Sequence, residues 1–316
     1  MSIDSIPHTD PSTANEVTGM WILTQALKRV GIDTMYGLVG IPVTEFAYIA
    51  QGEGIKFVGF RHEQQAGMAA ATHGFLTKTP GVLLTVSSLG FLNGLTATAN
   101  ATVNCYPMIQ ISGSSEREPI DLMQGTYEGL DQLNIAKPLV KAAYRINRPE
   151  DIMTGVVRAY RAAVSGRPGG VYLDVTTPCL GAVMDRKAAE ATLYTPVDLC
   201  PAVVPSPQSV ARAMELLAGA KKPVILLGKG AAYAQVDDKI RKFIEATGVP
   251  FYQMSMAKGL LPDNHELSVN SMRSYFMEQA DVVMLIGARL NWLLSRGHGK
   301  WNPDGKFIQI DIDPEE

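Results

Sequence analysis

Short apolar runs alternate with stretches of helical periodicity over the first half of the chain. The apolar runs lack regular polar alternation, as expected of strands covered on both faces, and lie at residues 35–39, 56–60, 82–86 and 108–112. Helical periods follow them near residues 43–51, 64–77 and 92–103. This order predicts a doubly wound α/β domain, which a helix over 149–164 and a strand over 170–175 would complete.

A second α/β pattern follows a proline-rich stretch. Residues 178–207 contain five prolines and little periodicity, so we expect a linker at 179–207. Beyond it, strands are predicted over 224–227, 250–253, 282–286 and 307–310, and helices over 209–218, 236–247 and 272–278. The expected fold class is therefore α/β, with two doubly wound, mostly parallel-sheet domains. We place a disordered tail at 1–16, the first domain at 17–178 and an incomplete, Rossmann-like second domain at 208–316.

Composition agrees with a two-domain globular protein. The chain has 316 residues, of which 46% are hydrophobic and 19% charged, so a large buried core can form. A net charge of -3 without a basic cluster disfavours nucleic-acid binding. The three cysteines are widely spaced and odd in number, which favours a reducing, cytoplasmic location. Neither a signal-peptide pattern nor an apolar run of membrane-spanning length is found, so no membrane association is expected.

Glu63 is the first candidate for chemistry. The carboxyl ends of parallel strands meet at one edge of a sheet, where the ligands of such domains bind. Glu63 follows the second predicted strand and precedes an alanine- and glycine-rich helix. A carboxyl in apolar surroundings can share a proton with a ring nitrogen, which would make Glu63 an acid–base group. The alternative is that Glu63 only complements the dipole of the helix that it begins.

Three further strand ends of the first domain carry glycine or small polar residues. The turn at 37–42 either lets backbone approach a ligand or is an ordinary strand-to-helix turn. Segment 87–94 could cradle a ring or an anion, or Ser88 could simply cap a helix. Segment 112–117 leads towards Tyr127, which either presents its hydroxyl to a substrate or is a half-buried structural tyrosine.

The second domain places single cations beside glycines. Lys229 and Arg289 each follow a predicted strand within a glycine-containing turn, and Asp311 ends the last strand. None of these turns matches a complete dinucleotide-binding or phosphate-loop motif. Together the three residues suggest a nucleotide with phosphates and a ribose, whereas each alone is also compatible with a solvated surface charge.

Longer segments of the chain resemble the oxalyl-CoA decarboxylases. The similarity extends over nearly the whole chain after residue 17, and includes the string Gly-Lys-Gly-Ala-Ala-Tyr-Ala-Gln at 228–235. The other segments that carry it are 36–42, 60–64, 90–94, 112–117, 165–172, 254–263 and 286–293. The resemblance implies a thiamine diphosphate- and Mg²⁺-dependent decarboxylation of oxalyl-CoA to formyl-CoA.

The resemblance also implies roles for particular residues. Glu63 matches the glutamate that hydrogen-bonds the aminopyrimidine ring of thiamine diphosphate, and Ile41 and Tyr127 match positions that border the substrate, Tyr127 also as a candidate catalytic group. The positions that match the binding site for ADP, an expected activator, are Arg167, Lys229, Arg289 and Asp311. The positions that match the contact with the coenzyme A part of the substrate are Asn270, Ser271, Met272, Arg273 and Ser274.

The family resemblance implies partners as well. In this family a third domain holds Mg²⁺ and the diphosphate, so no metal ligand is expected among these 316 residues. We expect a homo-oligomer, a dimer or tetramer, or assembly with a separate diphosphate-binding chain, and no decarboxylation by the 316 residues alone. Alternatives are a 2-hydroxyacyl-CoA lyase, an acetolactate-synthase-like enzyme, or a non-catalytic ADP-binding regulatory subunit.

Overall fold

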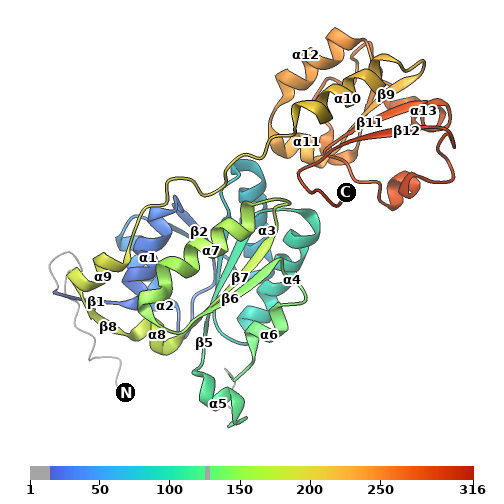
Figure 1. Cartoon of the computed structure of the whole chain (residues 1–316). Coiled ribbons are helices and arrows are strands. Elements are labelled where there is room, and N and C mark those ends of the chain that lie inside the picture. The colour runs from blue at the N-terminus through green and yellow to red at the C-terminus, as the bar shows by residue number, and fades with distance from the viewer. Residues whose placement is uncertain (1–14, 125–128) are drawn as a thin grey trace. The chain divides into compact units, whose positions relative to one another are not determined.

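Two compact units make up the chain. The computed structural model describes residues 15–124 and 129–316, and the chain divides between Pro201 and Ala202 (Figure 1). This boundary lies within the segment predicted as a linker. Each unit has its own parallel sheet and its own hydrophobic core, which confirms the predicted fold class.

The first unit is built on a parallel sheet of six strands among its described residues. In spatial order these are β3 (Lys56–Gly59), β2 (Thr34–Gly37), β4 (Gly81–Thr85), β5 (Met108–Ser114), β7 (Gly170–Thr176) and β6 (Ala142–Ile146). Because β3 and β4 lie on opposite sides of β2, the direction of winding reverses between β2 and β4. Ligands of open parallel sheets bind at such a switch point, beyond the carboxyl ends of the strands.

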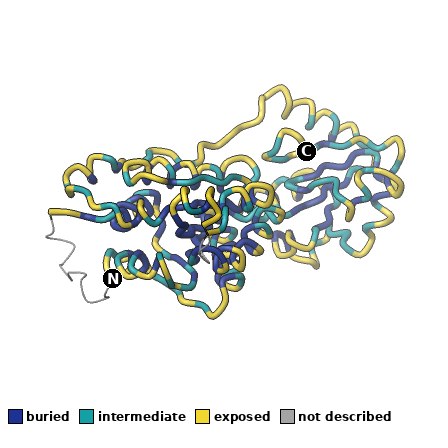
Figure 2. Tube along the Cα trace, turned by 90° about the horizontal axis from the view of Figure 1, so that it is seen from below, coloured by how far each residue is buried: buried dark blue, intermediate teal, exposed yellow. Residues whose placement is uncertain are grey.

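Helices cover both faces of this sheet, and the central strands are therefore buried throughout (Figure 2). One face carries α1 (Gly19–Arg29), α2 (Thr44–Gly52) and α7 (Ile152–Val164). The other carries α3 (Glu63–Thr77), α4 (Leu89–Asn104) and the short α6 (Gln132–Ala136). Burial on two faces explains why β4 and β5 read as continuous apolar runs in the sequence.

Two parts of the first unit differ from the prediction. Strand β6 was missed because Ala142–Arg145 are only partly buried, so their sequence has neither an apolar run nor clean alternation. Residues 179–193, predicted as the start of the linker, instead pack on the first unit. They include β8 (Val183–Asp185), which pairs antiparallel with β1 (Glu16–Thr18), and α9 (Arg186–Thr192). Strands of three residues are too short for a periodic signal, and their pairing depends on residues distant in sequence.

The second unit, described over its whole length, contains a four-stranded parallel sheet. Its spatial order is β10 (Phe251–Gln253), β9 (Pro223–Leu227), β11 (Val282–Ile286) and β12 (Lys306–Ile310). Helices α10 (Pro207–Ala218), α11 (Lys229–Ala234) and α12 (Asp237–Thr247) contribute to the core on one face, and α13 (Arg273–Gln279) contributes on the other. The winding reverses between β9 and β11, so the second unit has a switch point of its own.

Short elements complete the chain without adding strands to either sheet. They are α5 (Arg117–Asp121), η2 (Pro149–Asp151), α8 (Thr177–Gly181), η3 (Ser255–Ala257), η4 (Asn270–Met272) and η5 (Trp292–Gly297). Within the two described stretches of chain, no helix combines the length and the apolar character needed to cross a bilayer.

One carboxylate joins two segments of the second unit. Asp281, just before β11, accepts hydrogen bonds from the backbone N–H groups of Lys221 at 2.7 Å and Lys222 at 2.9 Å. Burial acts to raise the pKa of Asp281, but the backbone hydrogen bonds outweigh it, so this pKa lies below its usual value. A carboxyl with a lowered folded-state pKa stabilises the fold above its unfolded-state pKa, and this contribution is lost as the pH falls.

We therefore expect Asp281→Asn to be less stable than the unchanged chain near neutral pH, with a difference that shrinks below about pH 4, where the unfolded carboxyl is protonated. Urea unfolding of both proteins at a series of pH values between neutral and about pH 3 measures this. A stability difference that stays constant over the whole series would contradict the assignment.

Candidate active site

Glu63 lies at the switch point of the first sheet. It is the first residue of α3, and only 8% of it is exposed to solvent. One carboxylate oxygen, Oε2, accepts a hydrogen bond from the Asn93 side-chain amide of α4 at 3.1 Å. The carboxyl is thus held between the N-terminal ends of two helices, at the edge of the sheet where ligands are expected.

Glycines bring the loops at this edge into close contact. A Cβ atom on Gly90 would lie 3.1 Å from the Glu63 Oε1 atom and 2.4 Å from Val86 Cγ2. A Cβ on Gly40, in the loop after β2, would lie 2.6 Å from Val86 Cγ1. The glycines of the two predicted turns, 37–42 and 87–94, therefore allow the backbone to pack closely against Val86. Gly90 also leaves room for the carboxyl of Glu63.

Apolar side chains stand exposed on the same loops. Ile41 is 69% exposed and Leu89 68% exposed, at the ends of neighbouring strands β2 and β4. The Ile41–Pro42 peptide bond is cis. A buried carboxylate beside exposed apolar groups suits a flat heterocycle that offers a ring nitrogen to the acid and a hydrophobic face to the aliphatic side chains.

Two residues proposed from the sequence have different outcomes. Ser88 occupies the N-cap position of α4, but its side chain makes no capping hydrogen bond, and its backbone has a positive φ of 55°. The simple capping interpretation of Ser88 is therefore wrong. Tyr127 lies outside the described residues.

In the second unit, three of the proposed nucleotide-binding residues lie at one edge of the sheet. Lys229, Arg289 and Asp311 follow the ends of β9, β11 and β12, which are neighbouring strands. The fourth, Arg167, belongs to the first unit, in the connection between α7 and β7. The fold of the second unit thus gathers two cations and one acid at its own switch point.

The loops after β9 and β11, which carry Lys229 and Arg289, contact each other through glycine backbone atoms. The N–H of Gly230 donates to the carbonyl of Gly287 at 2.9 Å, and a Cβ on Gly287 would lie 2.3 Å from the backbone nitrogen of Ala231. Gly287 has a φ of +59°, which favours glycine. Arg289 has Glu316 at 3.9 Å, and Asp311 Oδ1 accepts a hydrogen bond from the N–H of Asp313 at 3.1 Å.

Residues 270–274 fall into two groups. Asn270 accepts a hydrogen bond from the N–H of Gln253 at 2.8 Å and donates to Asp263 at 3.0 Å, so its side chain is engaged within the protein. Arg273 lies over the Tyr252 ring, with 5.9 Å from Cζ to the centroid, and donates to the Leu293 carbonyl. The side chains of the other three are exposed and free to face a ligand; they are Ser271, Met272 and Ser274.

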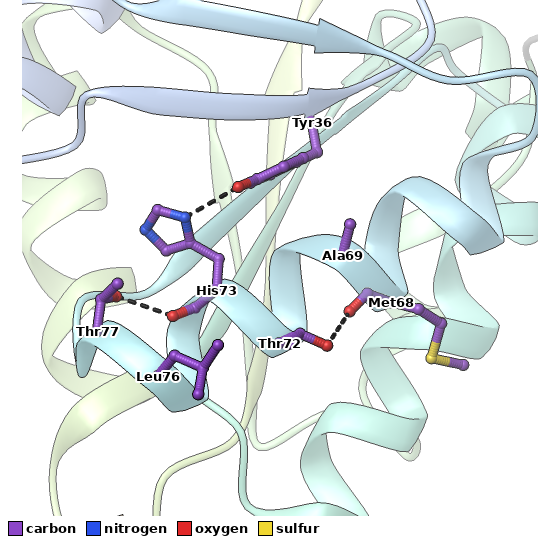
Figure 3. Close-up of a pocket in the computed structure, with 7 residues that line it drawn as sticks. All are labelled: Tyr36, Met68, Ala69, Thr72, His73, Leu76 and Thr77. Carbon is purple, nitrogen blue, oxygen red and sulfur yellow. Dashed lines mark hydrogen bonds between the residues drawn. The ribbon is translucent and has the colours of Figure 1, made fainter.

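A shallow pocket of about 540 Å³ lies along the outer side of α3 (Figure 3). It is lined by α3 residues from Met68 to Thr77 and by Tyr36 of β2, whose hydroxyl is 3.0 Å from His73 Nδ1. Glu63 is not among its lining residues, so this pocket is separate from the strand-end site. Over the described part of the chain, no cluster of three or more His, Cys, Asp or Glu side chains is arranged to hold a metal ion.

Comparison with known proteins identifies the family. Residues 17–135 match the N-terminal TPP-binding domain of thiamine pyrophosphate enzymes, and residues 210–316 match their central domain. The chain belongs to the thiamine pyrophosphate enzyme family. This confirms the resemblance drawn from the sequence.

Among individual relatives, the oxalyl-CoA decarboxylase of Escherichia coli K12 is 57% identical over 298 residues, which is 94% of this chain and 53% of the relative. The 2-hydroxyacyl-CoA lyase of Oryza sativa is 40% identical over 316 residues, 98% of this chain and 54% of the relative. The human 2-hydroxyacyl-CoA lyase 1 is 38% identical over 305 residues, 95% of this chain and 52% of the relative. The chain thus spans about half the length of these relatives.

The contact between Gly90 and Glu63 can be tested directly. We expect Gly90→Ala to destabilise the first unit by about 1–3 kcal/mol, because the added methyl group overlaps Val86 and displaces the carboxyl of Glu63. Gly52→Ala is the matched control, since a Cβ at this helical glycine would meet nothing within 4 Å. Urea unfolding curves compare the two, and equal stability of both variants would contradict the close contact.

Proposed function

We propose that the protein catalyses the thiamine diphosphate-dependent decarboxylation of oxalyl-CoA to formyl-CoA. The observation that carries the proposal is the burial of Glu63 at the switch point of the first sheet, with one oxygen bound to Asn93 and the other beside Gly90. The 57% identity with the oxalyl-CoA decarboxylase of Escherichia coli K12, against 40% with the plant lyase, favours oxalyl-CoA over a 2-hydroxyacyl-CoA as the substrate.

The residues of the site fit the pyrimidine end of the cofactor. Thiamine diphosphate, when bound, supplies the electron sink for decarboxylation. Glu63 would hold a proton between its carboxyl and a ring nitrogen, because Asn93 fixes Oε2 and leaves Oε1 available on the side where Gly90 has no side chain. The exposed side chains of Ile41 and Leu89 would cover the apolar part of the ring and keep water away from this proton.

The family resemblance supplies candidate substrate-binding residues. We assign Ile41 and Tyr127 to the acyl end, with Tyr127 as a candidate catalytic group, and residues 270–274 to the coenzyme A end. Of the latter, Ser271, Met272 and Ser274 are the candidates for direct contact, since they are exposed. Asn270 and Arg273 would hold the segment in place through their contacts with Gln253 and Tyr252.

We also propose an ADP site on the second unit, with ADP as an activator. Lys229 and Arg289 would face the phosphates and Asp311 the ribose, because these three lie at neighbouring strand ends around a switch point. The family resemblance adds Arg167 as a fourth candidate ADP-binding residue. Mg²⁺ and the diphosphate group would be bound by residues other than these 316. We propose a cytoplasmic homodimer or homotetramer, or assembly with a separate diphosphate-binding chain.

The decisive variant is Glu63→Gln, made in the full-length protein and assayed for formyl-CoA. We expect the turnover rate to fall by about 10²–10⁴-fold, because an amide cannot exchange the proton. The matched control is Asp237→Asn, which removes a carboxylate from the first turn of α12 in the other unit and should leave turnover unchanged. The 316 residues alone are expected to form no formyl-CoA.

Two outcomes would reject the catalytic role. If Glu63 only complements the helix dipole, Glu63→Gln lowers the melting temperature and leaves turnover intact. If the protein is a regulatory subunit, ADP raises the melting temperature while thiamine diphosphate with Mg²⁺ does not, and no formyl-CoA is formed by the full-length protein.

The ADP site is tested by ligand-dependent thermal stabilisation. The melting temperature should rise with ADP concentration, because a ligand that binds only the folded state stabilises it by mass action. We expect Lys229→Met and Arg289→Met each to weaken ADP binding by about tenfold or more, as charge-assisted hydrogen bonds are lost. Lys258→Met, which removes an exposed cation paired with Asp263, is the control and should bind ADP normally. Equal affinity in all three variants would place ADP elsewhere.

A further inference from the structure

Gln132 connects the loop after β4 with strands β5 and β7 of the first sheet. It is the first residue of α6 and is completely buried. Its carbonyl oxygen accepts a hydrogen bond from the backbone N–H of Ser88 at 2.5 Å. Its amide nitrogen donates to the carbonyl of Gly113 at 3.0 Å and to the Tyr172 hydroxyl at 2.8 Å. One side chain thus joins the loop after β4 to β5 and β7.

The hydrogen bond to Gln132 stabilises an unusual backbone conformation at Ser88. Its φ of 55° and ψ of -103° are rarely adopted by residues other than glycine. Ser88 does not stabilise the helix through a side-chain cap, so its own hydroxyl does not hold α4 in place. The hydrogen bond from its N–H to Gln132 fixes the point at which α4 begins.

The start of α4 determines the surroundings of Glu63. Two residues after Ser88, the Cα of Gly90 lies so close to the carboxyl that an added Cβ would be 3.1 Å from Oε1. One turn further on, Asn93 donates its hydrogen bond to Oε2. A shift of the first turn of α4 therefore moves both of the contacts that orient the carboxyl.

The residue before Gln132, Asp131, contacts a charged side chain of the neighbouring strand β6. Asp131 is the N-cap of α6, where it accepts a hydrogen bond from the Asn134 side-chain amide at 2.6 Å. It also lies 3.5 Å from Arg145 of β6, which forms a 2.7 Å ion pair with the fully buried Asp174 of β7. Burial raises the pKa of Asp174, and the charge of Arg145 opposes that rise. The start of α6 is thereby attached to β6 and β7.

We propose that Gln132 is a positioning residue for Glu63, acting through Ser88 and the first turn of α4. The inference rests on the proposed function, because it gives Glu63 its acid–base task. It adds that the orientation of the Glu63 carboxyl is set by a buried amide on α6, whose hydrogen bonds go to Ser88, Gly113 and Tyr172.

The first test needs no cofactor. In Gln132→Met, which keeps the volume and removes the acceptor, hydrogen exchange at the Ser88 amide of the ligand-free full-length protein should accelerate by about tenfold or more. Gln132→Glu keeps an acceptor for this N–H and should leave its exchange slow. The control is Thr24→Val: Thr24 is an equally buried polar residue of α1, on the opposite face of the sheet, whose hydroxyl donates to the carbonyl of Met20, and its loss should leave the Ser88 amide protected.

The second test separates positioning from a general loss of stability. For the full-length protein with thiamine diphosphate and Mg²⁺, Gln132→Met should lower kcat by about 10–100-fold with KM for oxalyl-CoA nearly unchanged, since only the geometry of the acid is disturbed. Gln132→Glu should recover part of that kcat. Thr24→Val, which removes a buried hydrogen bond of α1, should leave kcat unchanged.

Several results would overturn the proposal: unchanged Ser88 exchange in Gln132→Met, unchanged kcat, or equal losses of kcat in Gln132→Met and Thr24→Val. Should Gln132→Met fail to fold, Asp131→Asn replaces it, because asparagine keeps the helix cap and loses the ion pair. It should then raise Ser88 exchange by a smaller factor, and no rise would count against the proposal. If the protein without substitutions neither binds thiamine diphosphate nor forms formyl-CoA, the proposed function is refuted. The hydrogen-exchange test needs no cofactor, so its result is independent of that outcome.

Discussion

The contact of the Glu63 carboxyl with Gly90 and Asn93 is the interaction on which the candidate site of the first unit depends. Only 8% of Glu63 is exposed, so its carboxyl depends on protein neighbours: the Asn93 amide donates to Oε2, and Gly90, which has no side chain, leaves room for Oε1. Both partners belong to α4, so the relative position of α3 and α4 defines where the acid can act. The parallel sheet brings these two helix starts to the same edge, because β3 and β4 flank β2.

The second unit repeats this construction with different groups at the edge of its sheet. Its loops after β9 and β11 also meet through glycine backbone, at Gly230 and Gly287. Here, however, the groups at the sheet edge are partly exposed charges, and none is buried as Glu63 is. Charges that stay in contact with solvent suit phosphates and sugars, whereas a buried acid beside apolar groups suits proton exchange with a ring.

Buried polar groups below the first site explain how its loops keep their conformation. Gln132 and Gln110 place two amides within the layer formed by the sheet and α4. Such groups are costly to bury unless each hydrogen bond is made, and a shift of one loop would leave donors and acceptors unpaired. The strand ends are therefore coupled, and the positive φ of Ser88 is tolerated because Gln132 stabilises it.

Local sequence determined the α/β class, most strands of both sheets and the charges at their ends, because burial on two faces leaves uninterrupted apolar runs such as those of β4 and β5. It also indicated Glu63 as an acid at a strand end. The edge strand β6 and the β1–β8 pair were missed, since partly buried or three-residue strands carry no periodic signal.

Only the tertiary structure decided which of these residues meet. Gln132 gave no signal in the sequence, because its partners Ser88, Gly113 and Tyr172 lie 44, 19 and 40 residues away along the chain. Likewise, the environment of Glu63 depends on Asn93, 30 residues distant, and on the missing side chain of Gly90. Residue type and spacing encode which groups can react, whereas burial and hydrogen bonding between distant segments determine which ones are held in position to do so.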